Sequence, residues 1–167
     1  VYLAAENDQV KLDQIPQAQS SLISFIPKTG EVLSYVGGSV FNDSQFDRVR
    51  QSYPQSGSVF KPFIYASAFS GGYNPSSLIN DAPIIFEDEN LETFWRPENY
   101  SGKFYGLTTL REALVQSINI VSIKLLREIG IKKSSETIDN FGFGTERLPQ
   151  DLSLALGSGN FSPAEVA

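Results

Sequence analysis

The chain has 167 residues, of which 41% are hydrophobic and 19% charged, a composition that favours one domain with a sizeable core and argues against disorder. Its net charge of −6 and pI near 4.6 argue against a nucleic-acid-binding surface. The absence of Cys excludes disulfides, thiolate metal sites and a Cys nucleophile, and the absence of His excludes a Ser-His-Asp triad within the chain.

Two patterns of membrane targeting can be sought in the sequence. No stretch approaches the roughly 18 consecutive apolar residues of a membrane span, and no charged-then-apolar signal peptide opens the chain. Because the sequence also lacks Met, we expect it to be cut from a longer polypeptide. Residues 1–19 are mixed and polar and are expected to form a linker or a small peripheral segment.

Two short apolar runs, residues 21–26 and 31–36, are rich in strand formers. They flank Pro27-Lys28-Thr29-Gly30, which has Pro and Gly where a hairpin turn needs them. The pattern predicts an antiparallel hairpin.

A mostly apolar helix is predicted over residues 58–69, ended by Gly71 and Gly72. Pro62 is tolerated because it falls in the first turn, where few N–H groups have helical partners. Residues 73–106 contain several Pro and Gly residues and are expected to form a long irregular connection.

Three more helices are predicted in the last third of the chain. Thr108 or Thr109 can cap the first of them, with Glu112 placed for a capping box. A further helix start is marked by Ser162, followed by Pro163 and Glu165. The three helices are expected at 109–116, 120–129 (ended by Gly130) and 134–141.

The segment Gly57-Ser58-Val59-Phe60-Lys61 places a nucleophile and a base one helical turn apart. Positions i and i+3 lie about 5–6 Å apart on one helix face. Ser58 would sit at the helix N-terminus, where free N–H groups and the dipole favour an anion. Lys61, in an apolar stretch, would lose charge stabilisation through desolvation and could then accept the Ser58 proton.

The same two residues have a simpler interpretation, in which Ser58 caps the helix and Lys61 faces solvent. Two observations favour the catalytic one. The S-x-x-K spacing occurs once in the chain, and the helix around Lys61 is otherwise apolar, where an unpaired ammonium is costly.

A second polar pair, Ser117 and Asn119, falls between two predicted helices. A Ser hydroxyl there can relay a proton, and an Asn amide can donate to and accept from a substrate amide. The same residue types also serve as ordinary helix caps. The S-x-N spacing occurs again at Ser158-Gly159-Asn160, and we favour Ser117 because it lies at the helix junction.

Taken together, the order and spacing of these pieces resemble the transpeptidase domain of class A penicillin-binding proteins, the bifunctional peptidoglycan synthases. The resemblance covers nearly the whole chain. In it, Ser117-Ile118-Asn119 corresponds to the second motif of the family, and the segment around Ser158 corresponds to a separate, later signature. The segments that carry it are residues 26–33 with 36–38, 55–63, 78–83, 97–100, 109–114 with 117–119, and 154–159 with 162–163.

The resemblance implies that Ser58 is the nucleophile, Lys61 its base, Ser117 a further catalytic residue and Asn119 a substrate-binding residue. Such enzymes also use a third motif, K-T-G, which follows the other two on a strand lining the cleft. The one K-T-G of this chain, at residues 28–30, precedes Ser58 and falls in the predicted turn, so we do not assign it that role.

The implied fold is α/β of the α+β type, the penicillin-binding transpeptidase or serine β-lactamase-like fold, with helices packed on an antiparallel sheet. Residues 20–167 would be the N-terminal part of a transpeptidase domain, truncated before the third-motif strand and missing its C-terminal half. By itself, the 167-residue chain is expected to be inactive or impaired.

The implied activity is D,D-transpeptidation. Ser58 would attack the D-Ala-D-Ala bond of a peptidoglycan stem peptide, and the acyl-enzyme would pass to an amine of a neighbouring stem. β-Lactams would acylate the same serine. The resemblance implies no metal, organic cofactor or nucleic acid. It places the parent protein in the cell inner membrane, facing the periplasm, with a membrane anchor and a glycosyltransferase domain.

Two other function classes share the S-x-x-K chemistry. A D,D-carboxypeptidase or serine β-lactamase would send the acyl group to water, and a non-enzymatic β-lactam sensor would stay acylated. The class A signatures argue against the hydrolases, and turnover with and without an amine acceptor separates all three.

Overall fold

The computed structural model describes residues 2–6, 9–14, 18–87 and 94–167. The chain divides into two compact units, one formed by residues 1–52, 162–165 and 167, the other by residues 53–161 and 166. Within the described ranges, no helix has both the length and the apolar character needed to cross a membrane.

The first unit contains two antiparallel hairpins. The predicted hairpin is confirmed as β3 paired with β4, joined by a turn in which Gly30 N donates to Ile26 O at 2.8 Å. Gly30 has φ +73°, a conformation that glycine adopts without strain. Lys28 and Thr29 therefore lie in this turn, as predicted. The strands are β1 (Tyr2–Glu6), β2 (Gln9–Asp13), β3 (Leu22–Phe25) and β4 (Val32–Val36).

The short helix α5 (Pro163–Val166) begins where the sequence predicts a helix start. Glu165 N donates to Ser162 Oγ at 3.4 Å, and Ser162 N donates to Glu165 Oε2 at 2.7 Å. This reciprocal pair is the predicted capping box.

The second unit opens with a 3₁₀ turn, η1 (Gly57–Phe60), that leads into α1 (Lys61–Ser70). The helix predicted from residue 58 therefore starts as a tighter turn. Pro62 explains the difference, because it has no N–H to donate to the Ser58 carbonyl as an α-helix requires. The Lys61 N–H donates to that carbonyl instead, which is the 3₁₀ pattern.

The later helices are α2 (Leu110–Val115), α3 (Asn119–Ile129) and α4 (Ile131–Asp139), followed by the 3₁₀ turns η2 (Thr145–Arg147) and η3 (Leu152–Leu156). Thr109 caps α2 by accepting from Glu112 N at 3.2 Å. The third predicted helix begins three residues early, directly after Gly130. Gly130 has φ +90°, so a single residue separates α3 from α4.

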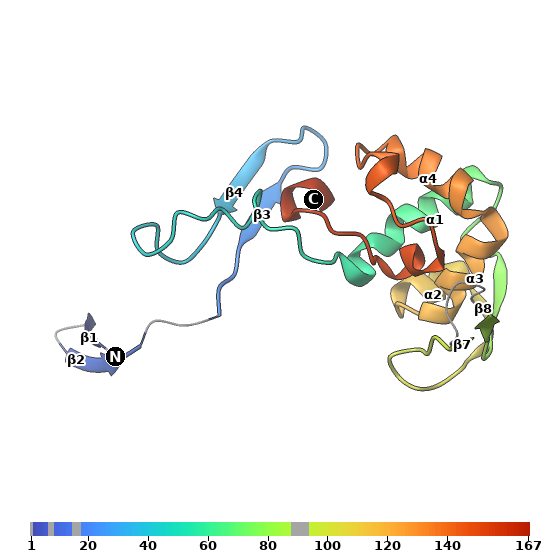
Figure 1. Ribbon diagram of the computed structural model, residues 1–167, viewed down its shortest axis with the longest axis horizontal. Helices are drawn as coiled ribbons and strands as arrows, with labels where there is room; N and C mark the ends of the chain where they lie inside the picture. The colour runs from blue at the N-terminus through green and yellow to red at the C-terminus, as the bar shows by residue number, and fades with distance from the viewer. Residues whose placement is uncertain (1, 7–8, 15–17, 88–93) are drawn as a thin grey trace. The chain divides into compact units, whose positions relative to one another are not determined.

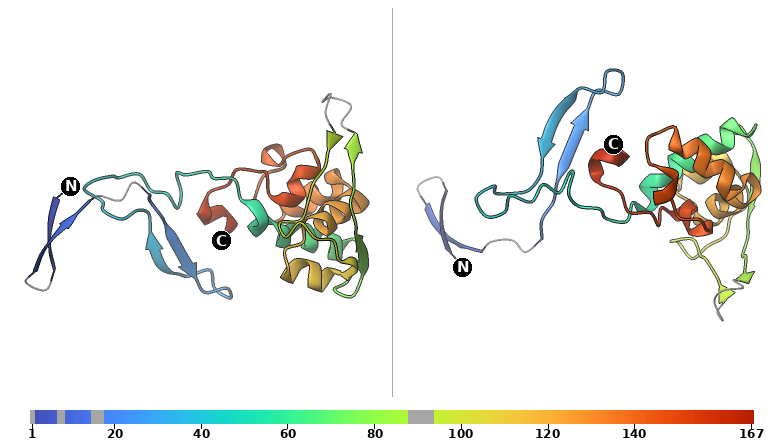
Figure 2. Two further views of the ribbon diagram at one scale, coloured as in Figure 1. Left: turned by 90° about the horizontal axis from the view of Figure 1, so that it is seen from below. Right: turned by 45° about the horizontal axis from the view of Figure 1, so that its top comes forward.

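The expectation of an irregular connection over residues 73–106 is wrong in part. Among the residues that the structure describes in this range, strands lie or begin at β5 (Leu78–Asp81), β6 (Phe86–Glu87), β7 (Phe94–Trp95) and β8 (Gly106–Thr109). β5 pairs antiparallel with β8, and β6 with β7. The β5–β8 pairing joins segments far apart in sequence, so local patterns do not reveal it. β5 and β8 run side by side along the helices (Figure 2).

The core of this unit forms around α1, which packs against α2, α3 and α4 (Figure 1). α3 also packs against β5, so helices lie on the short antiparallel sheet of β5 and β8, a different sheet from the predicted hairpin of β3 and β4. An aromatic cluster closes the end of α1 that carries η1, with ring centroids 4.8 to 5.6 Å apart. Its members are Phe60, Phe63, Phe141, Phe143 and Phe161.

Candidate active site

The turn that carries Ser58 is held by backbone contacts from the segment after η3. Gly57 N donates to Gly157 O at 2.9 Å, and Ser56 N donates to Gly159 O at 3.1 Å. Gly157 is left-handed, and a Cβ atom there would lie 2.0 Å from Gly57 O. Only glycine therefore allows the two backbones to approach this closely.

Ser58 is exposed on η1, three positions before Lys61. In a 3₁₀ turn the side chains at i and i+3 lie on one side, so the predicted shared face is retained. In the described part of the chain no hydrogen bond joins Ser58 Oγ to Lys61 Nζ, which donates to Ser117 and Asn119 instead.

Lys61 is almost completely buried, with 1% of its surface exposed. Its Nζ donates to Ser117 O at 2.7 Å, Ser117 Oγ at 3.0 Å and Asn119 Oδ1 at 2.7 Å. Desolvation lowers the pKa of Lys61 to about 8, as its apolar surroundings predict. The structure thus brings together three of the four predicted site residues by direct hydrogen bonds.

Ser117 has φ +53°, the one described non-glycine residue with positive φ. It follows α2 in a Schellman arrangement, in which Ser117 N donates to Leu114 O at 3.1 Å and Ile118 N to Ala113 O at 2.8 Å. Glycine usually fills this position, because a side chain there costs about 1–2 kcal/mol. In this strained conformation both the carbonyl oxygen and the hydroxyl oxygen of Ser117 accept from Lys61 Nζ.

Asn119 is the first residue of α3. Its side-chain Nδ2 donates to Glu98 O at 3.0 Å, while its Oδ1 accepts from Lys61. The two ends of the amide are therefore distinguished by their partners. The amide bridges Lys61 and the loop that precedes β8.

Asn99, in that loop, was not singled out by the sequence. Its Oδ1 accepts from Asn119 N at 3.0 Å and from Ile120 N at 3.1 Å. Its Nδ2 bonds to the buried carboxylate of Asp81. The sequence did show residues 97–100 as one of the segments that resemble the family. It gave Asn99 no role, because the residues that Asn99 contacts are distant in sequence.

The second S-x-N match, at residues 158–160, has different partners. Ser158 Oγ bonds to Ser153 Oγ at 2.6 Å, and Gly159 O accepts from Ser56 N and from Ser56 Oγ. Asn160 forms an antiparallel bridge with Gln55. This segment supports the backbone before Ser58.

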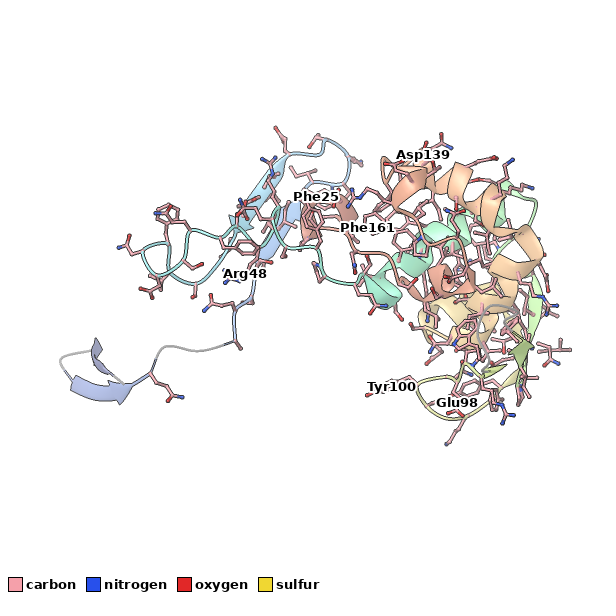
Figure 3. The ribbon with its side chains drawn as sticks, viewed as in Figure 1. Phe25, Arg48, Glu98, Tyr100, Asp139 and Phe161 are labelled. Carbon is pink, nitrogen blue, oxygen red and sulfur yellow. The ribbon has the colours of Figure 1, made fainter. Side chains whose placement is uncertain are left out.

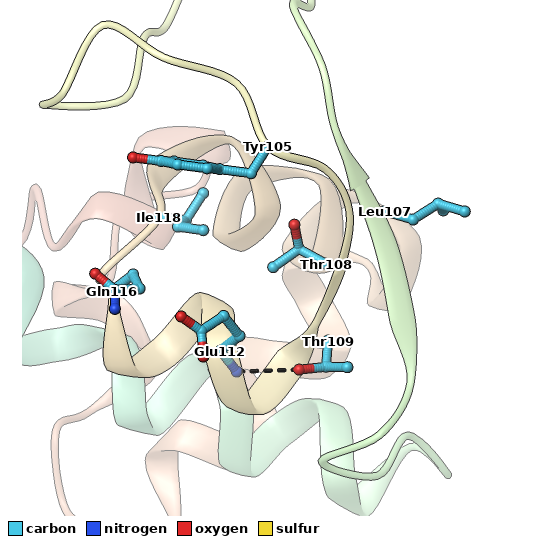
Figure 4. Close-up of a pocket in the computed structure, with 7 residues that line it drawn as sticks. All are labelled: Tyr105, Leu107, Thr108, Thr109, Glu112, Gln116 and Ile118. Carbon is cyan, nitrogen blue, oxygen red and sulfur yellow. Dashed lines mark hydrogen bonds between the residues drawn. The ribbon is translucent and has the colours of Figure 1, made fainter.

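A pocket of about 540 Å³ lies beside the second motif, between β8 and α2 (Figure 4). Gln116 and Ile118, the two neighbours of Ser117, line it, but none of the four predicted site residues does. The predicted site residues therefore lie outside this pocket. The other lining residues are Tyr105, Leu107, Thr108, Thr109 and Glu112.

Comparisons with known proteins show the family of the chain. Residues 23–159 match the family model of the penicillin binding protein transpeptidase domain. The chain is 47% identical to penicillin-binding protein 1A of Pseudomonas aeruginosa over 162 residues, which are 97% of this chain and 20% of that protein. The chain thus spans about a fifth of the length of the curated relatives it matches.

Solved structures show the same fold. The crystal structure of penicillin-binding protein 1A from Haemophilus influenzae matches with a TM-score of 0.89 and 36% identity, covering 97% of this chain and 24% of that one. PonA1 from Mycobacterium tuberculosis in complex with penicillin V matches with a TM-score of 0.73, covering 89% and 43%. At 20% identity this second likeness shows the fold alone.

These matches confirm the expected α+β fold and the resemblance to class A proteins. The family assignment rests on the model match over most of the chain and on relatives above 40% identity. The chain belongs to the transpeptidase domain family of penicillin-binding proteins.

Proposed function

We propose that this chain supplies the nucleophile, the base and the second motif of a serine D,D-transpeptidase, with Ser58, Lys61, Ser117 and Asn119 in these roles. The observation that carries the proposal is the buried Lys61 Nζ, held between Ser117 Oγ and Asn119 Oδ1 at 3.0 and 2.7 Å. A buried lysine of lowered pKa one turn from an exposed serine is a suitable general base.

The first half-reaction follows from these positions. With a pKa of about 8, roughly a tenth of the Lys61 side chains are neutral at pH 7. Neutral Lys61 accepts the Ser58 proton as Ser58 Oγ attacks the carbonyl of the penultimate D-Ala. The peptide bond breaks, the leaving D-Ala amine takes a proton that Ser117 relays from Lys61, and an ester to Ser58 remains.

In the second half-reaction, an amine of a neighbouring stem peptide attacks that ester. Lys61 accepts the amine proton, the ester bond breaks, and the proton returns to Ser58 Oγ. The Ser58 N–H, at the start of the turn, would stabilise the oxyanion in both steps. A β-lactam ring would open on Ser58 in the same way as the donor peptide bond.

The similarity to proteins named penicillin-binding protein 1A supports the remaining roles. Residues 20–167 would form the N-terminal part of the transpeptidase domain, with residues 1–19 as a linker or peripheral segment. The third motif would come from the rest of the parent polypeptide. The parent would be anchored in the inner membrane, face the periplasm and carry a glycosyltransferase domain.

The test uses the full-length parent protein with a stem-pentapeptide donor, with and without an amine acceptor. Without the acceptor we expect a single equivalent of D-Ala per enzyme, released on acylation; continued D-Ala release and cross-linked product should appear only with the acceptor. A labelled penicillin should give one adduct, on Ser58, by peptide mass spectrometry. Ser58→Ala should abolish all three signals. Ser70→Ala, an exposed serine at the end of α1, is the matched control and should leave them unchanged. An adduct on Ser58→Ala would refute the assignment.

A further inference from the structure

The N-terminus of α3 is capped by a residue from another part of the chain. Ile118 occupies the N-cap position and its side chain has no polar atom to offer. Asn99 Oδ1 instead accepts from Asn119 N at 3.0 Å and from Ile120 N at 3.1 Å. Two N–H groups that a helix leaves unsatisfied are thus bonded to one distant amide.

Asn99 is held in this orientation by a buried carboxylate. Its Nδ2 lies 2.9 Å from both Asp81 Oδ1 and Oδ2, and 2.9 Å from Lys103 O. Asp81 is completely buried and also accepts from Tyr105 N at 2.9 Å. With the donor end of the amide bonded to the carboxylate, the acceptor end must face α3.

The position of Asp81 follows from the alternation of β5. Along Leu78–Asp81 the side chains alternate between exposed and buried, which turns Ile79 and Asp81 inward. Neighbouring Asn80 is exposed. A buried carboxylate without donors is costly, so Asp81 and Asn99 need one another.

The same loop fixes the side chain of Asn119. Glu98 O accepts from Asn119 Nδ2 at 3.0 Å, next to the Asn99 bonds to the Asn119 backbone. Adjacent residues of one loop therefore set both the backbone and the amide orientation of Asn119. That orientation presents Asn119 Oδ1 to Lys61 Nζ at 2.7 Å.

We propose that Asn99 and Asp81 are positioning residues for the acylation reaction, which act by holding Asn119 against Lys61. The chain of hydrogen bonds runs from Asp81 through Asn99 to the start of α3, and from Asn119 on to Lys61. This inference rests on the proposed function, in which Asn119 and Lys61 belong to the acylation machinery.

The test is a double-mutant cycle in the full-length protein, read as the rate of acylation by a labelled penicillin. Asn99→Ala should slow acylation about 10- to 100-fold, the scale of a small misplacement of a reacting group. Because Asn99 acts through Asn119, adding Asn99→Ala to Asn119→Ala should cost less than about threefold more. Losses that multiply would overturn the inference, since a general structural role gives independent effects.

Two controls separate positioning from loss of fold. Tyr100→Ala removes the fully exposed side chain next to Asn99, which projects away from the loop (Figure 3), and Asn80→Ala removes the exposed neighbour of Asp81. Both should acylate at the normal rate. If thermal unfolding shows that Asn99→Ala does not fold, Asp81→Asn replaces it. The new amide keeps the size of the side chain but places an NH2 donor against Asn99 Nδ2, which is itself a donor, so the orientation of Asn99 should be lost and the same coupling to Asn119 is expected.

Ser58→Ala in the same assay distinguishes the two proposals. Labelling of Ser58→Ala by the penicillin would contradict the proposed function itself. If Ser58→Ala is not labelled, but the rate losses of Asn99→Ala and Asn119→Ala multiply in the double variant, only the positioning role is contradicted.

Discussion

Lys61 Nζ lies 2.7 Å from Asn119 Oδ1, although the two residues are 58 positions apart in the chain. The contact joins the first turn of α1 to the first turn of α3, and Ser117 completes it from the junction before α3. A buried ammonium at this junction has three acceptors from a single tripeptide. In the proposed function, the protonation of Lys61 is the property on which acylation most directly depends.

Acylation should depend on pH through Lys61. Desolvation lowers the Lys61 pKa to about 8, so the neutral base becomes available as the pH rises toward that value. We expect the second-order rate constant of penicillin acylation by the full-length protein to increase about tenfold per pH unit below 7 and to level off above about 8. A rate independent of pH between 6 and 9 would contradict the role of Lys61 as base.

Stability should depend on pH through the same residue. The folded pKa of about 8 lies below the ordinary lysine value of 10.5, so between these values the unfolded chain holds a proton that the folded chain has lost. The contribution of Lys61 to the free energy of unfolding therefore rises from about pH 8 to 10.5. Below pH 8 the folded state bears the cost of a buried charge.

Lys61→Met tests this linkage, because it keeps the length and removes the charge. We expect the variant to lose the rise in stability between pH 8 and 10.5 relative to the parent, measured by denaturant unfolding. Lys124→Met, which removes a half-buried lysine that also donates to backbone carbonyls, is the matched control. Parallel stability curves for Lys61→Met and the parent would contradict the prediction.

Ser117 combines backbone strain with a functional side chain. Glycine relieves the strain at φ +53°, whereas alanine keeps it and loses the hydroxyl. Ser117→Gly should therefore be more stable than Ser117→Ala by about 0.5–1 kcal/mol, after the entropy of glycine in the unfolded chain is subtracted. Both should acylate far more slowly than the parent. Equal unfolding midpoints would show that the strain costs nothing.

Gly157 allows the close backbone contact that holds the turn carrying Ser58. A Cβ at Gly157 would lie 2.0 Å from Gly57 O, so Gly157→Ala must move the backbone next to the nucleophile. We expect lower stability and slower acylation. Gly102→Ala is a matched control, because Gly102 has a similar φ of +66° but no atom within 4 Å of the added Cβ, so it isolates backbone strain from the clash. If both variants acylate equally, the contact with Gly57 does not position Ser58.

Local sequence patterns determined several turns and helix starts. The Pro and Gly residues at 27 and 30 predicted the β3–β4 turn, and the cap residues Thr109 and Ser162 fixed two helix starts. The spacing of Ser58 and Lys61 placed them on one face whether the turn is α or 3₁₀. These features depend on contacts within a few residues, which is why a sequence reveals them.

Tertiary structure decided what surrounds Lys61. The apolar stretch predicted its desolvation, but its three acceptors, the pairing of β5 with β8 and the Asp81–Asn99 support all join segments tens of residues apart. The sequence favoured Ser117 over the second S-x-N match at Ser158, and the folded chain gives the two matches different partners. Asn119 meets a buried ammonium, and Asn160 pairs with a backbone, because burial and chain crossing, rather than local pattern, set the partners of a polar side chain.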